Sequence, residues 1–268
     1  MKAVVNRIIP FSSVDGPGNR TAIFLQGCNI DCKYCHNPET RKLCVQCGVC
    51  VKQCPVGALS VGEDGKVVFE PSKCVQCDTC IHVCPHDSSP RTCEMTPEEV
   101  YARVKKQIPF IRGISVSGGE CMLWPEFLTE LFRLARKDSL GTLIDSNGMI
   151  PFEQYPELME VSDGVMLDIK AFEASEHVKV AGVTNEMVLK NADYLQEPES
   201  FMRCGPSLCR IFTTPKKASG RWEISWHRIW NTEISGLRSL PIVRWACGSS
   251  IPISRCRTRS TWHIWQIY

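Results

Sequence analysis

The sequence predicts an α/β fold: a partial (β/α) barrel interrupted by an inserted α+β domain rich in cysteine. Strand-like and helix-like patterns alternate over residues 94–196, as in a parallel sheet covered by helices. Residues 38–93 differ in composition, since they are rich in Cys, Gly, Pro and Val. They contain a repeat whose two copies start thirty residues apart. We therefore expect the barrel at 1–37 and 94–196, the insert at 38–93, and a tail of different character at 197–268.

Bulk composition narrows the class of protein. The chain has 268 residues, 43% of them hydrophobic, which is enough for one large domain or one domain with an insert. A formal net charge of +2 gives no electrostatic reason to expect nucleic acid or a membrane surface as a partner. We expect no transmembrane helix, since no run of 18 apolar residues occurs, and no signal peptide, since the first residues lack a long apolar stretch.

Seventeen cysteines dominate the composition. Many of them stand two or three residues apart, a spacing too tight for a generic disulfide framework and suited to a soft metal. Thiolates that bind metal must stay reduced, so we expect a reducing, cytoplasmic location.

The first predicted strand leads into a cysteine loop. The run AIFLQ at 22–26 predicts a buried strand that ends at Gly27-Cys28. In the insert, residues 58–61 and 66–69 flank Glu63-Asp64-Gly65, which predicts a β-hairpin with an Asp-Gly turn. The insert is too short for a large apolar core, so bound metal clusters would have to hold it together.

Alternating elements follow the insert. The run Thr96-Pro97-Glu98-Glu99 predicts a capping box and a helix through about Gln107. Apolar periodicity predicts the others: strands at 114–117, 142–144 and 165–168, and helices after Pro125, near 151–160 and near 184–195. Polar or glycine-rich sequences end the three strands. In parallel α/β folds the site lies at the carboxyl ends of the strands, so we expect these segments to face the first cysteine loop.

Three groups of cysteines have ligand spacing. The first, a C-x3-C-x2-C run, predicts a [4Fe–4S] cluster with one iron left open. The second and third, both C-x2-C-x2-C-x3-C-P, predict two fully ligated clusters and therefore an electron relay to one reactive iron. The three groups are Cys28, Cys32 and Cys35; Cys44, Cys47, Cys50 and Cys54; and Cys74, Cys77, Cys80 and Cys84.

The first cysteine loop, with Tyr34 just before its last cysteine, resembles the signature of the radical S-adenosylmethionine (SAM) superfamily. Its surroundings resemble the glycyl-radical-enzyme activases, a family that includes pyruvate formate-lyase activase. The insert after Pro38 is similar to that of the larger activases, and the chain as a whole is most similar to the YjjW type over about residues 5–195. The sequences that carry the resemblance are IIPFS at 8–12, VDGPGNR at 14–20, FLQGC at 24–28, CHNP at 35–38, DSNGM at 145–149 and MLDIKA at 166–171.

The resemblance implies a reaction. The open iron would chelate SAM, and one electron would cleave SAM to a 5′-deoxyadenosyl radical. That radical would take hydrogen from a glycine Cα of a partner glycyl radical enzyme. A low-potential donor such as a flavodoxin or ferredoxin would supply the electron. The cofactors would be three [4Fe–4S] clusters, SAM and a monovalent cation.

The resemblance also implies roles for individual residues. Gly118, Gly119 and Glu120 would meet the SAM amino group, and Asp15 would lie near the bound glycyl loop. In each ferredoxin run the fourth cysteine would bind the other cluster, which groups Cys54 with the third run and Cys84 with the second. The remaining SAM residues would be Tyr34, Asp145, Ser146, Asn147, Asp168 and Lys170, and the cation ligands Asp145, Ser146, Met166 and Asp168.

Alternatives stay open at this point. The chain could be a radical SAM enzyme acting on another substrate, or a ferredoxin-like electron-transfer module whose barrel is broken. Zinc could replace iron–sulfur clusters at any of the cysteine groups, and the strand-end aspartates could simply be solvated. Cys93 and Cys121 belong to none of the three groups and are best explained as small buried residues.

The tail departs from the family pattern. The resemblance implies a strand V-R-x-V-x-V-P after the helix near 184–195, and residues 200–215 do not contain it. A choice of codons permitted for this stretch, translated two nucleotides out of frame, gives F-Y-E-V-R-T-V-I-V-P-D-L-Y-D-T. This translated sequence contains the expected strand. We hypothesise a frameshift between about Tyr194 and Ser200. The local signals beyond it disagree with one another, which argues against a unique native structure there.

Overall fold

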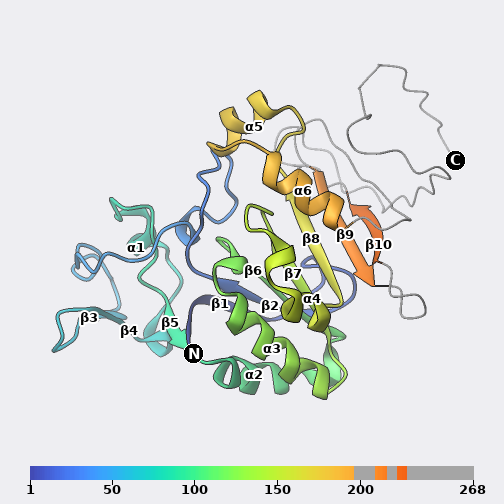
Figure 1. The fold of residues 1–268 in the computed structure, drawn as a ribbon. Helices are drawn as coiled ribbons and strands as arrows, with labels where there is room; N and C mark the ends of the chain where they lie inside the picture. Colours follow the sequence, from blue (N-terminus) through green and yellow to red (C-terminus); the bar gives the residue numbers. More distant parts are fainter. Residues whose placement is uncertain (196–208, 216–221, 228–268) are drawn as a thin grey trace, which may run out of the picture.

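A computed structural model of the chain describes residues 1–195, 209–215 and 222–227. Its centre is an eight-stranded sheet with the order β10-β9-β8-β7-β6-β2-β1-β5 (Figure 1). Strands β2, β6, β7 and β8 are parallel, and β1 and β5 continue the sheet in antiparallel pairing. The bounds are β1 Ala3–Ser12, β2 Arg20–Leu25, β5 Cys93–Met95, β6 Gly113–Gly118, β7 Gly141–Ser146 and β8 Gly164–Ile169.

Successive side chains along the parallel strands point alternately to the two faces of the sheet. Ile114 and Val116 of β6, together with Ile144 of β7, belong to the main apolar core, which also contains Phe127 of a covering helix. The residues between them point the other way, and of these Leu143 packs instead with Met166 in a small separate group. Because β-strand side chains alternate, this second face also carries Ser115, Ser117, Asp145 and Asp168. We call it the concave face.

Helices cover the apolar face. Helices α2, α3 and α4 pack beside one another, and α6 packs on β8 (Figure 1). The predicted capping box is confirmed, since the Thr96 side chain accepts from the Glu99 N–H and the Glu99 carboxylate accepts from the Thr96 N–H. The helix bounds are α2 Pro97–Lys105, α3 Pro125–Lys137, α4 Pro156–Val161, α5 Ala174–Ala181 and α6 Glu186–Tyr194.

Two helical segments differ from the prediction. The helix predicted near 151–160 is a 3-10 turn at Phe152–Gln154 followed by α4, because Pro156 lacks the N–H that a continuous helix needs. Helix α5 was not predicted. Its apolar periodicity is interrupted by polar residues, and Gly182, in the left-handed conformation, ends it after eight residues.

The insert forms its predicted hairpin. Strands β3 (Leu59–Val61) and β4 (Val67–Phe69) pair antiparallel, with Gly65 at a positive φ of 77° in the turn. Helix α1 (Thr79–His82) lies in the second half of the repeat. Figure 1 shows the insert beside the sheet, with β5 returning the chain to β1.

Two strands of the tail extend the sheet, and the weak periodicity of this region did not predict them. They are β9 (Cys209–Pro215) and β10 (Trp222–His227). β9 runs antiparallel to β8, whereas a strand reached through the crossover helix α6 would ordinarily be parallel. The rest of the predicted tail lies outside the described residues. Within the described part, no helix combines the length and apolar character needed to cross a bilayer.

Candidate cluster and cofactor site

The first cysteine loop is anchored on both sides by backbone hydrogen bonds. On one side, the N–H groups of Gly27 and Cys28 donate to Thr40 O and Arg41 O at 2.8 and 2.7 Å, where the insert begins. On the other, the Lys33 N–H donates to Val180 O of α5 at 2.9 Å. The loop therefore lies at the carboxyl edge of the parallel strands, as the sequence predicted.

The loop brings its three cysteines together. Cys32 is buried, and it packs with Ile30 and Ala181 in a group that Cys28 and Cys35 also contact. The pKa of Cys28 is raised to about 11, mainly by burial and to a smaller extent by the neighbouring carboxylate and thiol groups. Burial also raises the pKa of Cys32. Thiols in such surroundings stay protonated at neutral pH until a cationic metal centre displaces their protons.

The donor set suits an iron–sulfur cluster. Across the described residues, no group of three or more His, Cys, Asp or Glu side chains is placed to hold a single metal ion. A [4Fe–4S] cluster takes one thiolate at each ligated iron, so its ligands stand apart around the cube. A cluster held by only three thiols would have one iron without a protein ligand.

Gly118 and Gly119 bring β6 close to the chain that enters the cysteine loop. A methyl group at Gly118 would collide with the backbone of Leu25, and one at Gly119 with the backbone of Gly27. The close approach lets the Gly119 N–H donate to Leu25 O at 3.0 Å and the Glu120 N–H donate to Gly27 O at 2.7 Å. The glycine pair thus positions the cysteine loop, and the expected contact with SAM stays a prediction.

Glu120 is a buried carboxylate whose two oxygens are both used inside the protein. One oxygen accepts from the Met122 N–H at 2.9 Å and the Ser146 hydroxyl at 2.8 Å, and the other accepts from the Asn147 N–H at 2.7 Å. Burial raises its pKa from the ordinary 4.5 to about 7, against the effect of these hydrogen bonds. Glu120 therefore ties the end of β6 to the loop after β7. Its expected contact with the SAM amino group stays a prediction.

We expect Glu120 to make the stability of the metal-free protein depend on pH. A folded-state pKa above the unfolded value favours the folded state below pH 4.5, and the advantage is lost as the pH rises through 7. A shift from 4.5 to about 7 corresponds to roughly 3 kcal/mol. Denaturant unfolding between pH 4.5 and 7.5 should show this decline in the parent and a flat profile in Glu120→Gln. The exposed Glu153→Gln should keep the slope, and an equal slope in Glu120→Gln would refute the assignment.

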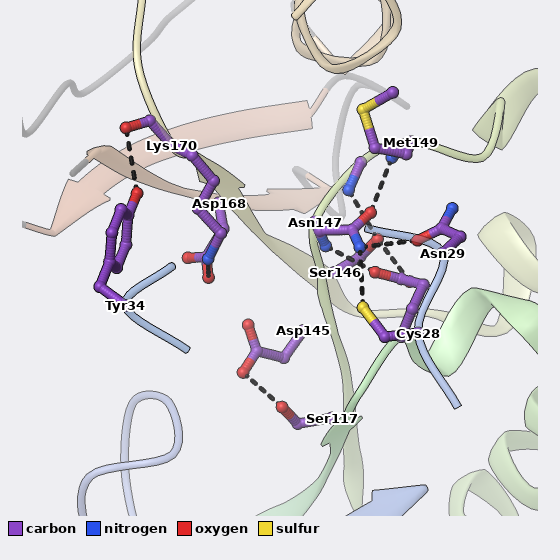
Figure 2. Close-up of polar contacts among 12 residues, drawn as sticks. Cys28, Asn29, Tyr34, Ser117, Asp145, Ser146, Asn147, Met149, Asp168 and Lys170 are labelled. Atoms are coloured by element: carbon purple, nitrogen blue, oxygen red, sulfur yellow. Dashed lines mark hydrogen bonds and ion pairs between the residues drawn. The ribbon is translucent and has the colours of Figure 1, made fainter. Parts of the chain in front are cut away.

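The loop after β7 contacts the cysteine loop through Asn147. Its side-chain N–H₂ donates to the Cys28 sulfur at 3.7 Å and to Asn29 Oδ1 at 2.9 Å. Its Oδ1 accepts from the Met149 N–H at 3.0 Å. Figure 2 shows these contacts converging on one carboxamide. Asn29 was not among the predicted residues, because an asparagine between cysteines carries no distinctive sequence signal.

The concave face carries the acidic strand ends. The Ser117 hydroxyl donates to Asp145 Oδ2 at 2.9 Å, and Lys170 Nζ lies 2.8 Å from Asp168 Oδ2 (Figure 2). The Tyr34 hydroxyl donates to Lys170 O at 3.2 Å, which joins the cysteine loop to the end of β8. Burial alone would lower the pKa of Lys170, but the Asp168 carboxylate raises it above its ordinary value, so this lysine stays charged.

Two predicted site residues, Met166 and Asp15, do not direct their side chains toward the other predicted residues. The Met166 side chain packs against Leu143, so only its main-chain atoms are available to a cation. Asp15 lies away from the carboxyl edge, since its backbone O accepts from Ser115, near the middle of β6. The Asp15 carboxylate accepts from the Ser12 hydroxyl at 2.5 Å. Asp15 therefore lies near the middle of the concave face, while the cysteine loop lies at its carboxyl edge.

Gln26 is a further positioning residue, which was not among the predicted site residues. It is fully buried, and its carboxamide donates to Glu39 O at 2.6 Å and Lys42 O at 2.7 Å. It thereby fixes the root of the insert to the strand before Cys28. A polar residue at the end of a buried strand, directly before the Gly-Cys pair, is the signal that could have identified it.

Two hollows in the insert each gather four cysteines. Cys44, Cys47 and Cys50 line the first hollow together with Cys84, the last cysteine of the other run. The second hollow is lined by Cys74, Cys77, Cys80 and Cys54. Each run therefore contributes its fourth cysteine to the hollow of the other, which is the grouping that the sequence predicted.

Comparison with known proteins places this site in a class. The sequence profile of the Radical SAM superfamily matches residues 22–198, a range that spans the cysteine loop and the strands from β6 to β8. The chain is thus a radical SAM protein, and this superfamily uses a [4Fe–4S] cluster and SAM.

Relatives narrow the class. The chain is 35% identical to the (2S)-3-sulfopropanediol sulfolyase activating enzyme of Bilophila wadsworthia, over 72% of this chain and 70% of that protein. It is 31% identical to the indoleacetate decarboxylase activating enzyme of Tractidigestivibacter scatoligenes, over 74% and 70%. It is 30% identical to the pyruvate formate-lyase-activating enzyme of Streptococcus mutans, over 72% and 60%. The chain belongs to the glycyl-radical-enzyme activating enzymes, radical SAM enzymes that act on a partner glycyl radical enzyme.

Proposed function

We propose that Cys28, Cys32 and Cys35 hold the SAM-binding [4Fe–4S] cluster with which this chain activates its partner. The observation that carries the proposal is the packing of three thiols from one loop at the carboxyl edge of the parallel strands. When bound, the reduced cluster supplies the electron that cleaves SAM to methionine and a 5′-deoxyadenosyl radical. The protein would hold SAM against the open iron and keep water from the radical.

Residues at the ends of β6, β7 and β8 would bind SAM. Gly118 and Gly119 offer backbone, and Lys170 offers a largely buried positive charge. Asp145 and Asp168 lie on neighbouring strands of the same face, which supports a site for a monovalent cation that also uses Ser146 and main-chain atoms of Met166. The other proposed SAM residues are Tyr34, Glu120, Asn147 and Asp168, each within the network described above.

The insert would be a two-cluster ferredoxin-like domain at 38–93 within a barrel at 1–37 and 94–196. The two hollows, each lined by four cysteines, support a count of three clusters. A low-potential flavodoxin or ferredoxin in a reducing cytoplasm would feed electrons to them. The glycyl loop of the partner would enter along the concave face. Asp15 lies on this face beside Ser115, away from the edge that carries the cysteine loop.

Anaerobic reconstitution tests the proposal. Iron near twelve per chain and SAM-dependent release of 5′-deoxyadenosine are expected, because three clusters carry about twelve irons. Co-expression with a glycyl radical enzyme should give the electron paramagnetic resonance (EPR) doublet of a glycyl radical. Iron near eight without SAM cleavage would instead favour an electron-transfer module, a reading to which the antiparallel β9 lends support.

In serine variants of the insert, the cluster that is lost should depend on the hollow that the cysteine lines and not on the sequence run to which it belongs. Cys54→Ser and Cys77→Ser should remove the same cluster, since both line the second hollow, and Cys47→Ser and Cys84→Ser should remove the other. Each variant should lose about four of about twelve irons. EPR spectra of the reduced variants identify which signal disappears. Pairing of Cys54 with Cys47 in these spectra would contradict the proposed ligation.

A further inference from the structure

Asn147 has a carboxamide whose orientation is fixed by its partners. Its Oδ1 accepts from a backbone N–H, that of Met149, at 3.0 Å. A carbonyl oxygen must occupy that position because an N–H₂ group cannot accept. The N–H₂ group therefore faces the other way, toward Asn29 Oδ1 at 2.9 Å and the Cys28 sulfur at 3.7 Å (Figure 2). Both N–H groups and one of the two lone pairs of the oxygen are thus engaged by protein partners.

Neighbouring elements hold Asn147 in place from two sides. From β6, the Glu120 carboxylate accepts from the Asn147 backbone N–H at 2.7 Å. From α6, the Asn191 carboxamide donates to Gly148 O and Ile150 O, both at 2.8 Å. Gly148 has a φ of +70°, and a methyl group there would collide with Leu167 and Val188. The loop is thus fixed by packing and by hydrogen bonds, and the donor toward Cys28 is already in place before any ligand binds.

The position of Asn147 matters because two groups face it from different elements, the buried Glu120 carboxylate and the Cys28 sulfur. Asn147 lies between the two groups, giving its backbone N–H to the carboxylate and its side-chain N–H to the sulfur. Reduction of a cluster adds negative charge that spreads onto its sulfurs, so a donor at one sulfur stabilises the reduced form more than the oxidised form.

We infer that Asn147 is a positioning residue that raises the reduction potential of the cluster held by Cys28, through its hydrogen bond to the Cys28 sulfur. The inference rests on the proposed function, since it takes Cys28 as a cluster ligand. It gives Asn147 a role in addition to its proposed contact with SAM, through the side-chain N–H that faces the Cys28 sulfur. Its effect would be to bring the SAM-binding cluster within reach of a biological reductant.

The test is a redox titration of the full chain, reconstituted anaerobically and followed by EPR. The SAM-binding cluster is the one whose signal changes when SAM is added, and the other clusters serve as an internal reference. In Asn147→Leu, which keeps the bulk and removes the donor, we expect reduction of that cluster to be about tenfold less favourable, equivalent to ~59 mV for one electron. The matched control Asn29→Ala removes another partner of the same N–H₂ group and should leave the potential unchanged.

An unchanged potential in Asn147→Leu, or an equal fall in Asn29→Ala, would overturn the inference. Should Asn147→Leu fail to take up the cluster, Asn147→Asp decides. It retains the acceptor for the Met149 N–H and replaces the donor by an oxygen, so its potential should fall further than that of the leucine variant. A potential equal to that of the parent chain would again overturn the inference. Absence of any SAM-responsive signal in the parent would instead refute the proposed function itself.

Discussion

Cys32→Ser should lose about four irons per chain and all SAM cleavage, while the spectra of the insert clusters persist. Three ligands are the complete thiolate set of the proposed site. Cys32 is also the most buried of them, at 7% exposed, between Ile30 and Ala181. A serine hydroxyl at this position is a poor iron ligand and leaves the cluster with two thiolates. Iron analysis measures the loss of irons, 5′-deoxyadenosine release measures SAM cleavage, and EPR spectra of the reduced variant show whether the insert clusters persist.

Cys121→Ser provides the control for this prediction. Cys121 is fully buried, and its thiol donates to Asp145 O at 3.2 Å, a bond that a serine hydroxyl also makes. Its iron content should equal that of the parent, because Cys121 lies in none of the three ligand groups. Loss of iron in both variants would point to a general effect of thiol removal, and retention of all irons in Cys32→Ser would contradict the ligand assignment.

Restoring the alternative reading frame from about residue 196 should stabilise the chain and raise SAM cleavage by more than about tenfold. A tenfold gain corresponds to roughly 1.4 kcal/mol of additional binding free energy for SAM. The profile match ends at residue 198, close to the hypothesised frame change. The restored sequence V-R-T-V-I-V-P has the continuous apolar character of a buried parallel strand. It would lie parallel to β8, where the present chain places the antiparallel β9.

The measurements are direct. Sequencing the locus again shows whether codons 194–200 hold an insertion or deletion, and an intact frame through codon 200 refutes the hypothesis. Thermal unfolding, aggregation at rest and SAM cleavage then compare the present chain with the restored one. A chain of unchanged length whose tail is scrambled serves as control and should behave like the present chain. Full SAM cleavage and glycyl-radical formation by the present chain would contradict the expected loss of activity.

Local patterns predicted the elements and the ends of strands where the site lies. Apolar periodicity located β6, β7 and β8, and the parallel pairing of these strands brings Gly118, Asp145 and Asp168 to one edge. The spacing of the insert cysteines, interpreted through the family resemblance, predicted the exchange of Cys54 and Cys84 between the two hollows. These features follow from short-range sequence or from a repeat, so no knowledge of distant contacts is needed to find them.

Features that depend on contacts between distant segments could not be predicted. Glu120 was selected for a contact with SAM, which stays a prediction. Its carboxylate also accepts from Met122, Ser146 and Asn147, and no sequence pattern reports which donors a buried carboxylate will find. The same holds for Asn29 and Asn191, whose partners lie on other elements. The direction of β9 is also a tertiary outcome, because a strand of suitable composition pairs either way along a free sheet edge.

The bonds from Gln26, Gly27 and Cys28 to residues 39–42 join the root of the insert directly to the first cysteine loop. If air destroyed the two clusters proposed for the insert, it would remove what holds so small a domain together. One of the four bonds comes from Cys28 itself, so unfolding of the insert would release the first cysteine loop directly. Oxygen damage far from the proposed SAM site would then reach it through this connection. Protection of the insert, by a bound partner or by strict anaerobiosis, would therefore also protect the first cysteine loop and the radical chemistry proposed for it.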